Sequence, residues 1–375
     1  MLAEPGLPFP IVQADAVVVE SAALEEFSVG LARAMGADAE VAIEVGRHLV
    51  RANLSGHDSH GVMRFIQYVE EADRGLLRPG ARPRLLRAGA TAALFDAQRG
   101  FGHYSTMVAT RWAIDRARHT GLGAAAVRHS MHVGRLGEYT ERITDEGLVG
   151  LVTVGVAGPD SGLVAPFGGV QRFLGTNPWS IGVPASGRPG FVYDAATSTV
   201  AEGKVRLARS RGDSLPPGLI RDADGRSSPD PAALYQGGTL TLLGDELAGH
   251  KGYGLSMAAA LVGGLAMVGD LDPTPAGCMR MPAAWGTRLA GVLVLVVDPA
   301  AFGDPEEYRR RVAEVLEAAT ASPPAPGREE VLVPGDLERR SRRRRAVEGV
   351  PIPGATWGEL ARIGERFGVR MPASR

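Results

Sequence analysis

The chain has 375 residues, 45% of them hydrophobic and 22% charged, so it can bury a sizeable core. Its formal net charge is −1, so it has no overall electrostatic field that would attract nucleic acid or a membrane surface. Its single cysteine, Cys278, excludes an internal disulfide and a cysteine-based zinc site, and is typical of a reducing cytoplasm. The first residues lack the features of a signal peptide, and the longest apolar stretch, residues 255–268, is too short to cross a membrane, so we expect a cytoplasmic protein.

The first eighty residues are predicted to be mainly helical, and we expect residues 1–82 to form a small helical domain. Two helices are expected over residues 21–36 and 38–54, where apolar residues recur at helical spacing. A third helix is expected over residues 59–75, because Ser59 is a natural N-cap and the apolar residues after it have the same spacing.

The middle of the chain, residues 83–288, is predicted to be an α/β domain that binds the cofactor and the substrate. Within it, a strand over 124–127, a helix over 134–146 and a strand over 148–154 form a strand–helix–strand unit. This order places the loop that carries His132 just beyond the carboxyl end of the first strand, where sites commonly lie.

Residues 121–126 match the letters of a GxGxxA phosphate-binding turn. A helix precedes them and a strand follows, the reverse of the Rossmann order, so a non-Rossmann fold is expected. The last segment, residues 289–375, is predicted to add a strand over 290–297 and helices that pack back on the N-terminal part. Its arginine-rich helix, over 337–348, is expected to be a solvated face because no aromatic residues are interleaved with the arginines.

The chemically richest segment, residues 55–64, contains two imidazoles, a carboxylate, two hydroxyls and a guanidinium. If the predicted helix forms, His60, Arg64 and Tyr68 follow one another at i, i+4 and i+8 and share a face. The guanidinium could then bind the carboxylate of a small 2-oxo or 2-hydroxy acid, while the imidazole reaches the neighbouring oxygen. Tyr68 is expected to contact the same substrate, and the helix N-terminus would favour its negative charge.

Other interpretations of this segment remain open. It could be a helix cap followed by polar surface residues. A metal site at His57, Asp58 and His60 is a weaker alternative, because the spacing is wrong for a helical pair and no HExxH motif or cysteine ligand supports it, so we expect no metal.

Three further residues each have a functional and a structural interpretation. His132 is either a second acid–base group or a loop histidine that caps the next helix. Asp194 follows an apolar strand, and it either orients an imidazole or caps a helix. Lys251 precedes a Gly-Tyr-Gly turn expected to open a helix, where it could meet a phosphate or the cofactor ribose, or could simply accompany a tight turn.

Motifs in order along nearly the whole chain resemble those of the malate/L-lactate dehydrogenase type 2 family, which are non-Rossmann NAD(P)-dependent reductases of 2-oxo acids and cyclic imino acids. The matching stretches are residues 58–64, 132–137, 165–169, 174–178, 194–198, 201–204, 250–254, 333–336 and 348–353. The resemblance implies a mixed α/β sheet domain joined to a helical N-terminal domain. It also implies a homodimer with the active site near the subunit interface.

The resemblance further implies roles for single residues. His60 would exchange the proton with the substrate, supported by Ser59 and Asp194, with His132 as a competing acid–base group. Arg64 would hold the substrate carboxylate, and Thr176 would also lie at the substrate. The implied cofactor-binding residues are His132, Gly134, Arg135, Leu136, Asp194, Ala195, Ala196, His250, Lys251, Gly335 and Asp336.

Two departures from the family pattern affect the expected cofactor and substrate. Ala195 stands where the family usually has methionine, and residues 155–157 stand where an Asn-Ser pair is common. We expect an oxidoreductase that transfers hydride between the nicotinamide of NAD or NADP and C2 of a small 2-oxo or 2-hydroxy acid. The alternatives are reduction of the C=N bond of a cyclic imino acid and, more remotely, a catalytically inactive cofactor-binding homologue.

Overall fold

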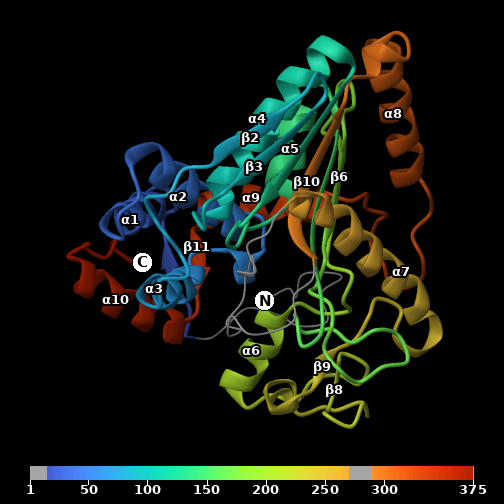
Figure 1. The fold of residues 1–375 in the computed structure, drawn as a ribbon. Helices are drawn as coiled ribbons and strands as arrows, with labels where there is room; N and C mark the ends of the chain where they lie inside the picture. The colour runs from blue at the N-terminus through green and yellow to red at the C-terminus, as the bar shows by residue number, and fades with distance from the viewer. Residues whose placement is uncertain (1–14, 270–288, 375) are drawn as a thin grey trace.

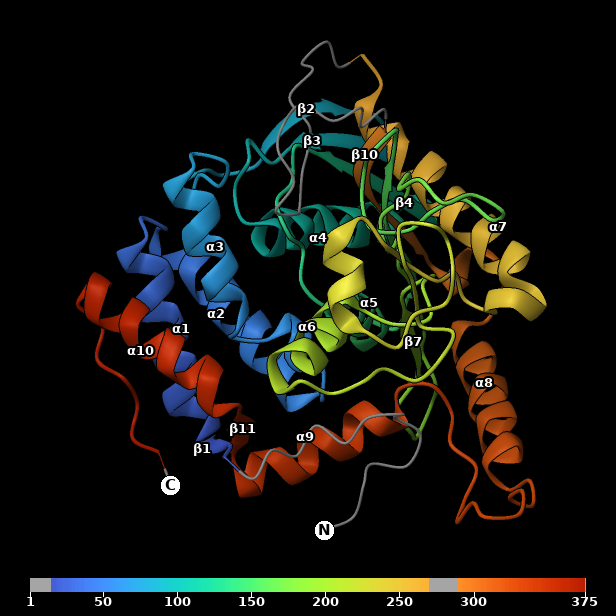
Figure 2. The ribbon, with the colours of Figure 1, turned by 90° about the horizontal axis from the view of Figure 1, so that it is seen from below.

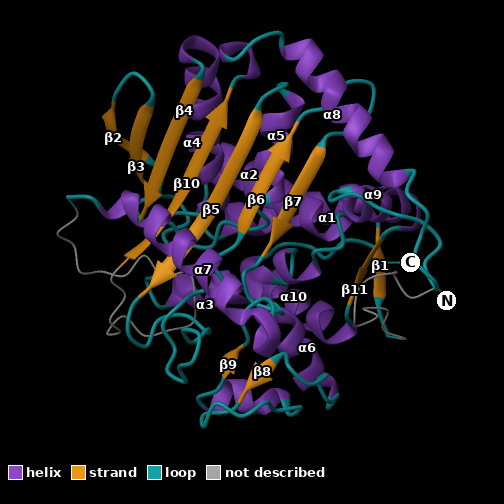
Figure 3. Cartoon of the chain, turned by 90° about the vertical axis from the view of Figure 1, so that its right-hand side faces the viewer, coloured by secondary structure: helices purple, strands orange, loops and turns teal. Residues whose placement is uncertain are grey.

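The computed structural model describes residues 15–269 and 289–374, so Cys278 and the extreme N-terminus lie outside the described residues. Its centre is a mixed sheet of seven strands, seen face-on in Figure 3. In spatial order they are β2 (Arg84–Ala88), β3 (Ala92–Asp96), β4 (Leu122–Arg128), β10 (Leu289–Val297), β5 (Val149–Ala157), β6 (Trp179–Val183) and β7 (Phe191–Ala195). Only β3 and β4 pair in parallel, so β3, β4, β5 and β7 all run in one direction, and their carboxyl ends share one edge.

Helices cover both faces of this sheet. On one face lie α4 (Gly102–Thr120) and α5 (Gly137–Asp145), and on the other lies α7 (Asp245–Gly263), continued by the 3₁₀ helix η3 (Gly264–Met267). The helix α7 approaches the strands very closely. A Cβ atom at Gly155 would lie 2.2 Å from the carbonyl oxygen of Ala259, so glycine at this position lets the helix backbone come this close.

The N-terminal helices and the C-terminal segment form a second unit. It contains α1 (Ser21–Ala34), α2 (Ala39–Leu54), α3 (Arg64–Asp73), α9 (Asp336–Glu348) and α10 (Gly354–Phe367). The short strands β1 (Val17–Val19) and β11 (Val350–Ile352) pair antiparallel and join the two ends of the chain. Figures 1 and 2 show the blue and red helices side by side, and a shared core contains Leu31, Leu49, Phe65 and Leu360.

The strand β10 is placed differently from the expectation. Residues 289–297 do not pack on the N-terminal helices, as α9 and α10 do. They form a strand of the main sheet, between β4 and β5. The physical reason is a continuous apolar run: Val292, Val294 and Val296 are buried on one face, and Leu293 and Leu295 on the other face are half-buried, which is typical of an interior strand covered on both faces.

A smaller lobe lies beyond the sheet edge where β4, β5 and β7 end, at the bottom of Figure 1. It holds α6 (Glu202–Arg211), the short strands β8 (Ile220–Arg221) and β9 (Thr239–Leu240), and the 3₁₀ helix η2 (Pro231–Gln236) around Val205 and Leu234. The remaining helices are η1 (Asp58–His60), η4 (Pro299–Ala301) and α8 (Pro305–Thr320). Among the described helices, none combines the length and hydrophobicity needed to span a bilayer.

Candidate active site

One large cavity, of about 1220 Å³, lies where the helical unit, the sheet and the smaller lobe meet. Its walls come from η1 and α3, from the carboxyl ends of β5 and β7, from the loop after β4, and from α6 and α9. The cavity is lined by eleven of the residues that the sequence analysis assigned to catalysis, substrate or cofactor: Ser59, His60, Arg64, His132, Gly134, Arg135, Leu136, Thr176, Asp194, Ala195 and Ala196. The fold therefore brings motifs from four separate parts of the chain to one place.

The segment that carries His60 is a 3₁₀ turn, and α3 begins only at Arg64, so the expected helix start at Ser59 is wrong. Asn53 explains the difference. Its side-chain oxygen accepts a hydrogen bond from the Val62 amide at 2.9 Å, and its amide group donates to Asp58 at 2.7 Å. A Cβ at Gly61 would lie 2.1 Å from the Asn53 oxygen, so glycine at this position lets the turn close on Asn53.

Two imidazoles stack within this cavity. The rings of His60 and His132 lie 5.5 Å apart between centroids, with 24° between their planes. Ser59 Oγ lies 3.0 Å from His60 Nδ1. Burial, and next the positive charge of Arg64, hold the pKa of both imidazoles well below the usual value, so both are neutral near pH 7.

Arg64 begins α3, next to the His60 turn. Its Nε donates a hydrogen bond to the Ser59 carbonyl oxygen at 2.5 Å, and its Nη1 donates to Gln67 Oε1 at 2.6 Å. These two contacts fix the guanidinium at the cavity wall, beside the two imidazoles whose pKa it lowers.

Tyr68 lies below the cavity wall and not among the residues that line it. The side chain is 1% exposed, and its hydroxyl lies 2.7 Å from His132 Nδ1 and 3.2 Å from His103 Nε2. The expected common face of His60, Arg64 and Tyr68 does not form, because His60 lies in the turn before the helix. Tyr68 thus reaches the cavity through His132, and His103, which the sequence did not single out, is its second partner.

The loop after β4 requires glycine at position 134. Gly134 has φ of +74°, and a Cβ there would lie 2.3 Å from Nε2 of the buried His48. The two adjacent expected cofactor residues, Arg135 and Leu136, follow in the same loop and line the cavity. His48 and His103 carried no sequence signal, because each is a lone histidine in a predicted helix or at its edge.

Asp194 lies on β7 and lines the same cavity. Its Oδ2 accepts a hydrogen bond from the Gly137 amide at 2.6 Å, at the first residue of α5, and lies 3.7 Å from Arg135 Nε. Burial raises the pKa of this carboxyl, and Arg135 opposes the rise. Asp194 therefore stabilises the N-terminus of a helix that precedes it by more than fifty residues, while its support of His60 stays a prediction.

The arginine-rich helix α9 is not simply a solvated face. Arg343 and Arg344 are exposed, but Arg345 is buried and donates to Asp58 Oδ1 at 2.7 Å. Arg342 donates to Ser55 Oγ at 2.9 Å and also contacts Glu141 of α5. The expectation failed because the acidic partners lie about two hundred residues or more away along the chain, where no local pattern reveals them.

The three side chains of the weaker metal hypothesis, those of His57, Asp58 and His60, contact different partners. His57 Nε2 lies 3.1 Å from Glu338, Asp58 binds Asn53 and Arg345, and His60 contacts Ser59. The three side chains therefore make four separate contacts with different residues.

Four expected cofactor residues, His250, Lys251, Gly335 and Asp336, are not among the described residues that line the large cavity. His250 and Lys251 lie on α7, which begins at Asp245 with a kink at Ala248, earlier than the Gly-Tyr-Gly turn predicted. Gly335 and Asp336 begin α9, and Asp336 accepts a hydrogen bond from the Val333 amide at 3.0 Å.

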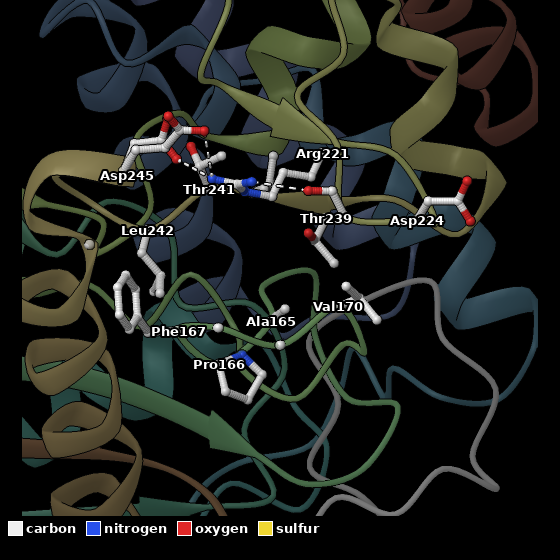
Figure 4. Close-up of a pocket in the computed structure, with 16 residues that line it drawn as sticks. Ala165, Pro166, Phe167, Val170, Arg221, Asp224, Thr239, Thr241, Leu242 and Asp245 are labelled. Carbon is white, nitrogen blue, oxygen red and sulfur yellow. Dashed lines mark hydrogen bonds and ion pairs between the residues drawn. The ribbon is translucent and has the colours of Figure 1, made fainter.

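A second cavity of about 380 Å³ lies beside the start of α7. Figure 4 shows Phe167, Val170 and Thr239 around it, with Arg221 at its edge bound to Asp245. The Arg221 Nη2 to Asp245 Oδ1 distance is 3.0 Å. The charge of the guanidinium is therefore already balanced within the chain.

The large cavity fits a nicotinamide dinucleotide together with a small acid. Its volume exceeds the upper end, roughly 1,000 Å³, of pockets that hold drug-sized ligands. Its walls combine apolar side chains, such as Leu136, Val154 and Val156, with the polar groups described above, which suits a flat ring with a polar chain.

The chain belongs to the malate/L-lactate dehydrogenase family, whose sequence profile matches residues 19–361. This confirms the resemblance, and the chain is a dehydrogenase or reductase of this family. It is 32% identical over 352 residues to malate dehydrogenase from Pyrococcus abyssi, covering 92% of this chain and 94% of that protein. It is 33% identical over 335 residues to Δ1-pyrroline-2-carboxylate reductase from Ancylobacter novellus, covering 89% of this chain and 93% of that protein.

Solved structures agree with this assignment. A putative malate/lactate dehydrogenase from E. coli superposes with a TM-score of 0.83 at 30% identity, covering 94% of this chain and 96% of that one. Δ1-piperideine-2-carboxylate reductase from Pseudomonas syringae superposes with a TM-score of 0.76 at 29% identity, covering 92% and 99%. Dehydrogenases of this family are typically NAD(P)-dependent, and the mixed sheet with N-terminal helices matches their fold.

Proposed function

We propose that the protein is an NAD(P)H-dependent reductase of a small 2-oxo carboxylate, and that it also oxidises the corresponding 2-hydroxy acid. One observation carries the proposal: Arg64, His60 and His132 line one cavity that is large enough for a dinucleotide, with the two imidazoles stacked. A guanidinium binds a carboxylate, and an imidazole exchanges a proton with the neighbouring oxygen, which are the two contacts that such a substrate needs.

In this proposal Arg64 holds the substrate carboxylate and Thr176 contacts the substrate nearby. His60 exchanges the proton, and the contact of Ser59 with its Nδ1 leaves Nε2 as the nitrogen that faces the substrate. His132 is the competing proton donor, fixed at its Nδ1 by Tyr68. The nicotinamide, when bound, supplies or accepts the hydride at C2 of the substrate.

The residues that would hold the cofactor are those of the loop after β4 and the end of β7. Within one chain these are His132, Gly134, Arg135, Leu136 and the run Asp194 to Ala196, all at the cavity wall. His250, Lys251, Gly335 and Asp336 remain assigned to the cofactor by family resemblance alone.

Reduction of a cyclic imino acid is the second candidate. The 33% identity to a Δ1-pyrroline-2-carboxylate reductase favours it. Such a substrate also presents a carboxylate beside an sp² carbon, so Arg64 and His60 would serve it in the same way.

The test is a paired assay of NADH and NADPH oxidation with a panel of 2-oxo acids and with pyrroline- and piperideine-2-carboxylate. Turnover of 2-oxo acids supports the first candidate, and turnover of the imino acids alone supports the second. Oxidation of neither cofactor with any acid would contradict both. A thermal shift on adding NADH or NADPH, without turnover, would then indicate a cofactor-binding homologue that is inactive.

A further inference from the structure

The substrate-binding guanidinium has two supporting residues on its own helix that no sequence motif indicated. Arg64 Nη1 donates to Gln67 Oε1 at 2.6 Å, and Gln67 Nε2 donates to Glu71 Oε1 at 2.7 Å. The spacings i, i+3 and i, i+4 place the three side chains in one row along α3. Gln67 lines the large cavity, while Glu71 lies behind it, 1% exposed.

Glu71 is an expensive residue to bury. Its Oε2 has no hydrogen-bond partner among the residues that the structure describes, and a buried polar atom without a partner destabilises the folded state. A position that needed only to fill space on α3 would favour an apolar side chain. A role for this carboxyl in the site therefore explains a buried glutamate at position 71 better than space-filling does.

We propose that Gln67 and Glu71 are positioning residues that hold the Arg64 guanidinium in its carboxylate-binding orientation. The inference rests on the proposed function, in which Arg64 binds the substrate carboxylate. The amide of Gln67 is oriented at both ends: its oxygen faces Arg64, which can only donate, and its nitrogen therefore faces Glu71, which accepts.

The relay also determines what Arg64 offers to a ligand. A guanidinium has five N–H donors. Ser59 and Gln67 accept from two of them, so three remain for a ligand. An arginine side chain is long and flexible, and holding its head in place before the substrate arrives lowers the entropy lost on binding.

Glu71 can serve the relay as a neutral group. Burial raises the pKa of its carboxyl to about 7, so near neutral pH a large fraction of molecules carries the protonated form. The carbonyl oxygen of that form still accepts from Gln67. Glutamine at position 71 has the same shape and an oxygen acceptor, and so should retain the relay, whereas alanine removes it.

The experiment compares Q67A, E71A and E71Q in the full-length enzyme, with E70Q on the exposed neighbouring position of α3 as the matched control. The substrate is the best acid from the panel above, measured beside its uncharged methyl ester. For Q67A and E71A we expect KM for the acid to rise about tenfold, the effect of losing one hydrogen bond to a charged group, with a much smaller change in kcat. For E71Q and E70Q we expect a KM for the acid within about twofold of the wild-type value. The KM for the ester should not change in any variant.

Three kinetic results would overturn the proposal: an unchanged KM for the acid in Q67A, an equal rise in KM for acid and ester, or no rescue by E71Q relative to E71A. Thermal unfolding of each variant shows whether the variant still folds. Because Gln67 lies at the cavity wall, Q67A is the variant for which we expect the smallest loss of stability. A crystal structure of Q67A gives a readout that needs no activity. A displaced Arg64 guanidinium supports the relay, and an unmoved one overturns it, even if the wild type turns over no acid and the proposed function itself fails.

Discussion

A guanidinium and two imidazoles share the wall of one cavity, and only the guanidinium is charged near neutral pH. Burial and Arg64 lower the pKa of His60 and His132, so of these three groups only Arg64 presents a positive charge to an anionic substrate. When a carboxylate neutralises Arg64, the largest charge effect that disfavours a protonated imidazole is removed. Substrate binding should therefore make proton exchange at His60 easier.

Replacing Arg64 with alanine should weaken substrate binding far more than it slows chemistry. Loss of a charge-assisted, two-bond contact costs about 2–4 kcal/mol, which corresponds to a rise in KM of roughly 30- to 900-fold. Steady-state kinetics of R64A measure this change. R64K is the matched control, since it keeps the charge without the forked guanidinium, and its KM should lie between those of R64A and the wild type. A KM for R64A within twofold of the wild-type value would contradict the assignment.

Removing the imidazole of His60 should lower kcat by roughly 10²–10⁴, the usual contribution of a general acid or base. The comparison is with H132A, measured under the same conditions. If H60A kept its kcat and H132A lost activity, the roles of the two histidines would be reversed.

The protonation of Glu71 should also affect stability. Its pKa is about 7 in the folded chain against 4.5 for the ordinary group, so between these values the folded state binds more protons than the unfolded state. Stability from this group is therefore lost as pH rises from 4.5 to 7. Relative to the wild type, E71Q should gain about 3 kcal/mol in free energy of unfolding over that range. Urea unfolding at pH 5 and pH 8 measures the gain, and an equal difference at both pH values would contradict it.

At the scale of elements, the His60 turn is held from outside its own helix. Asn53 of α2 and Arg345 of α9 both bind Asp58, and Arg342 of α9 contacts Glu141 of α5. Although burial opposes it, Arg135 and Arg342 lower the pKa of Glu141 to about 2, so this contact is an ion pair at neutral pH. Helix α9 thus connects the turn that carries His60 to α5, the helix whose N-terminus Asp194 stabilises.

Removing Arg345 should leave the largely buried Asp58 carboxylate without its ion-pair partner, with the Asn53 hydrogen bond still in place. Breaking one partner of a buried pair costs about 3–5 kcal/mol, and we expect R345M to lose about that much free energy of unfolding. The double variant R345M/D58N, which leaves no unpaired charge, should recover most of the loss. R343M, at an exposed position of the same helix, is the control and should lose less than about 0.5 kcal/mol.

At the scale of the whole molecule, the cavity lies where three parts of the chain meet. The loop after β4 and the carboxyl ends of β5 and β7 form one wall, the helical unit forms the second, and the smaller lobe with α6 forms the third. Leu247 and Leu261 on α7 and Leu265 on η3 are each more than half exposed, and exposed apolar patches are typical of an interface.

We expect a homodimer through these residues of α7 and η3. Light scattering should give a mass of twice the 39.3 kDa of one chain, and L261E should shift it toward the single-chain value. F302E, at an exposed phenylalanine outside α7, is the control and should keep the wild-type mass. A wild-type mass of one chain would rule out the dimer, and an unchanged mass for L261E would place its interface elsewhere.

Local sequence determined the composition of the site and the order of its parts. Residues 55–64 and the loop with His132 could be recognised because each concentrates polar chemistry within ten residues. The order of helix, strand and glycine around residues 121–126 excluded a Rossmann turn, and Gly121 indeed ends α4 before β4 begins.

Tertiary structure alone decided the rest, because the deciding contacts join different elements, and most of them join residues far apart in the chain. Asn53 and Gly61 converted the predicted helix start into a 3₁₀ turn. Arg345 found its partner 287 positions away, and β10 entered the main sheet between β4 and β5. Periodicity reports which residues share a face of one element, but burial and pairing depend on which other element covers that face.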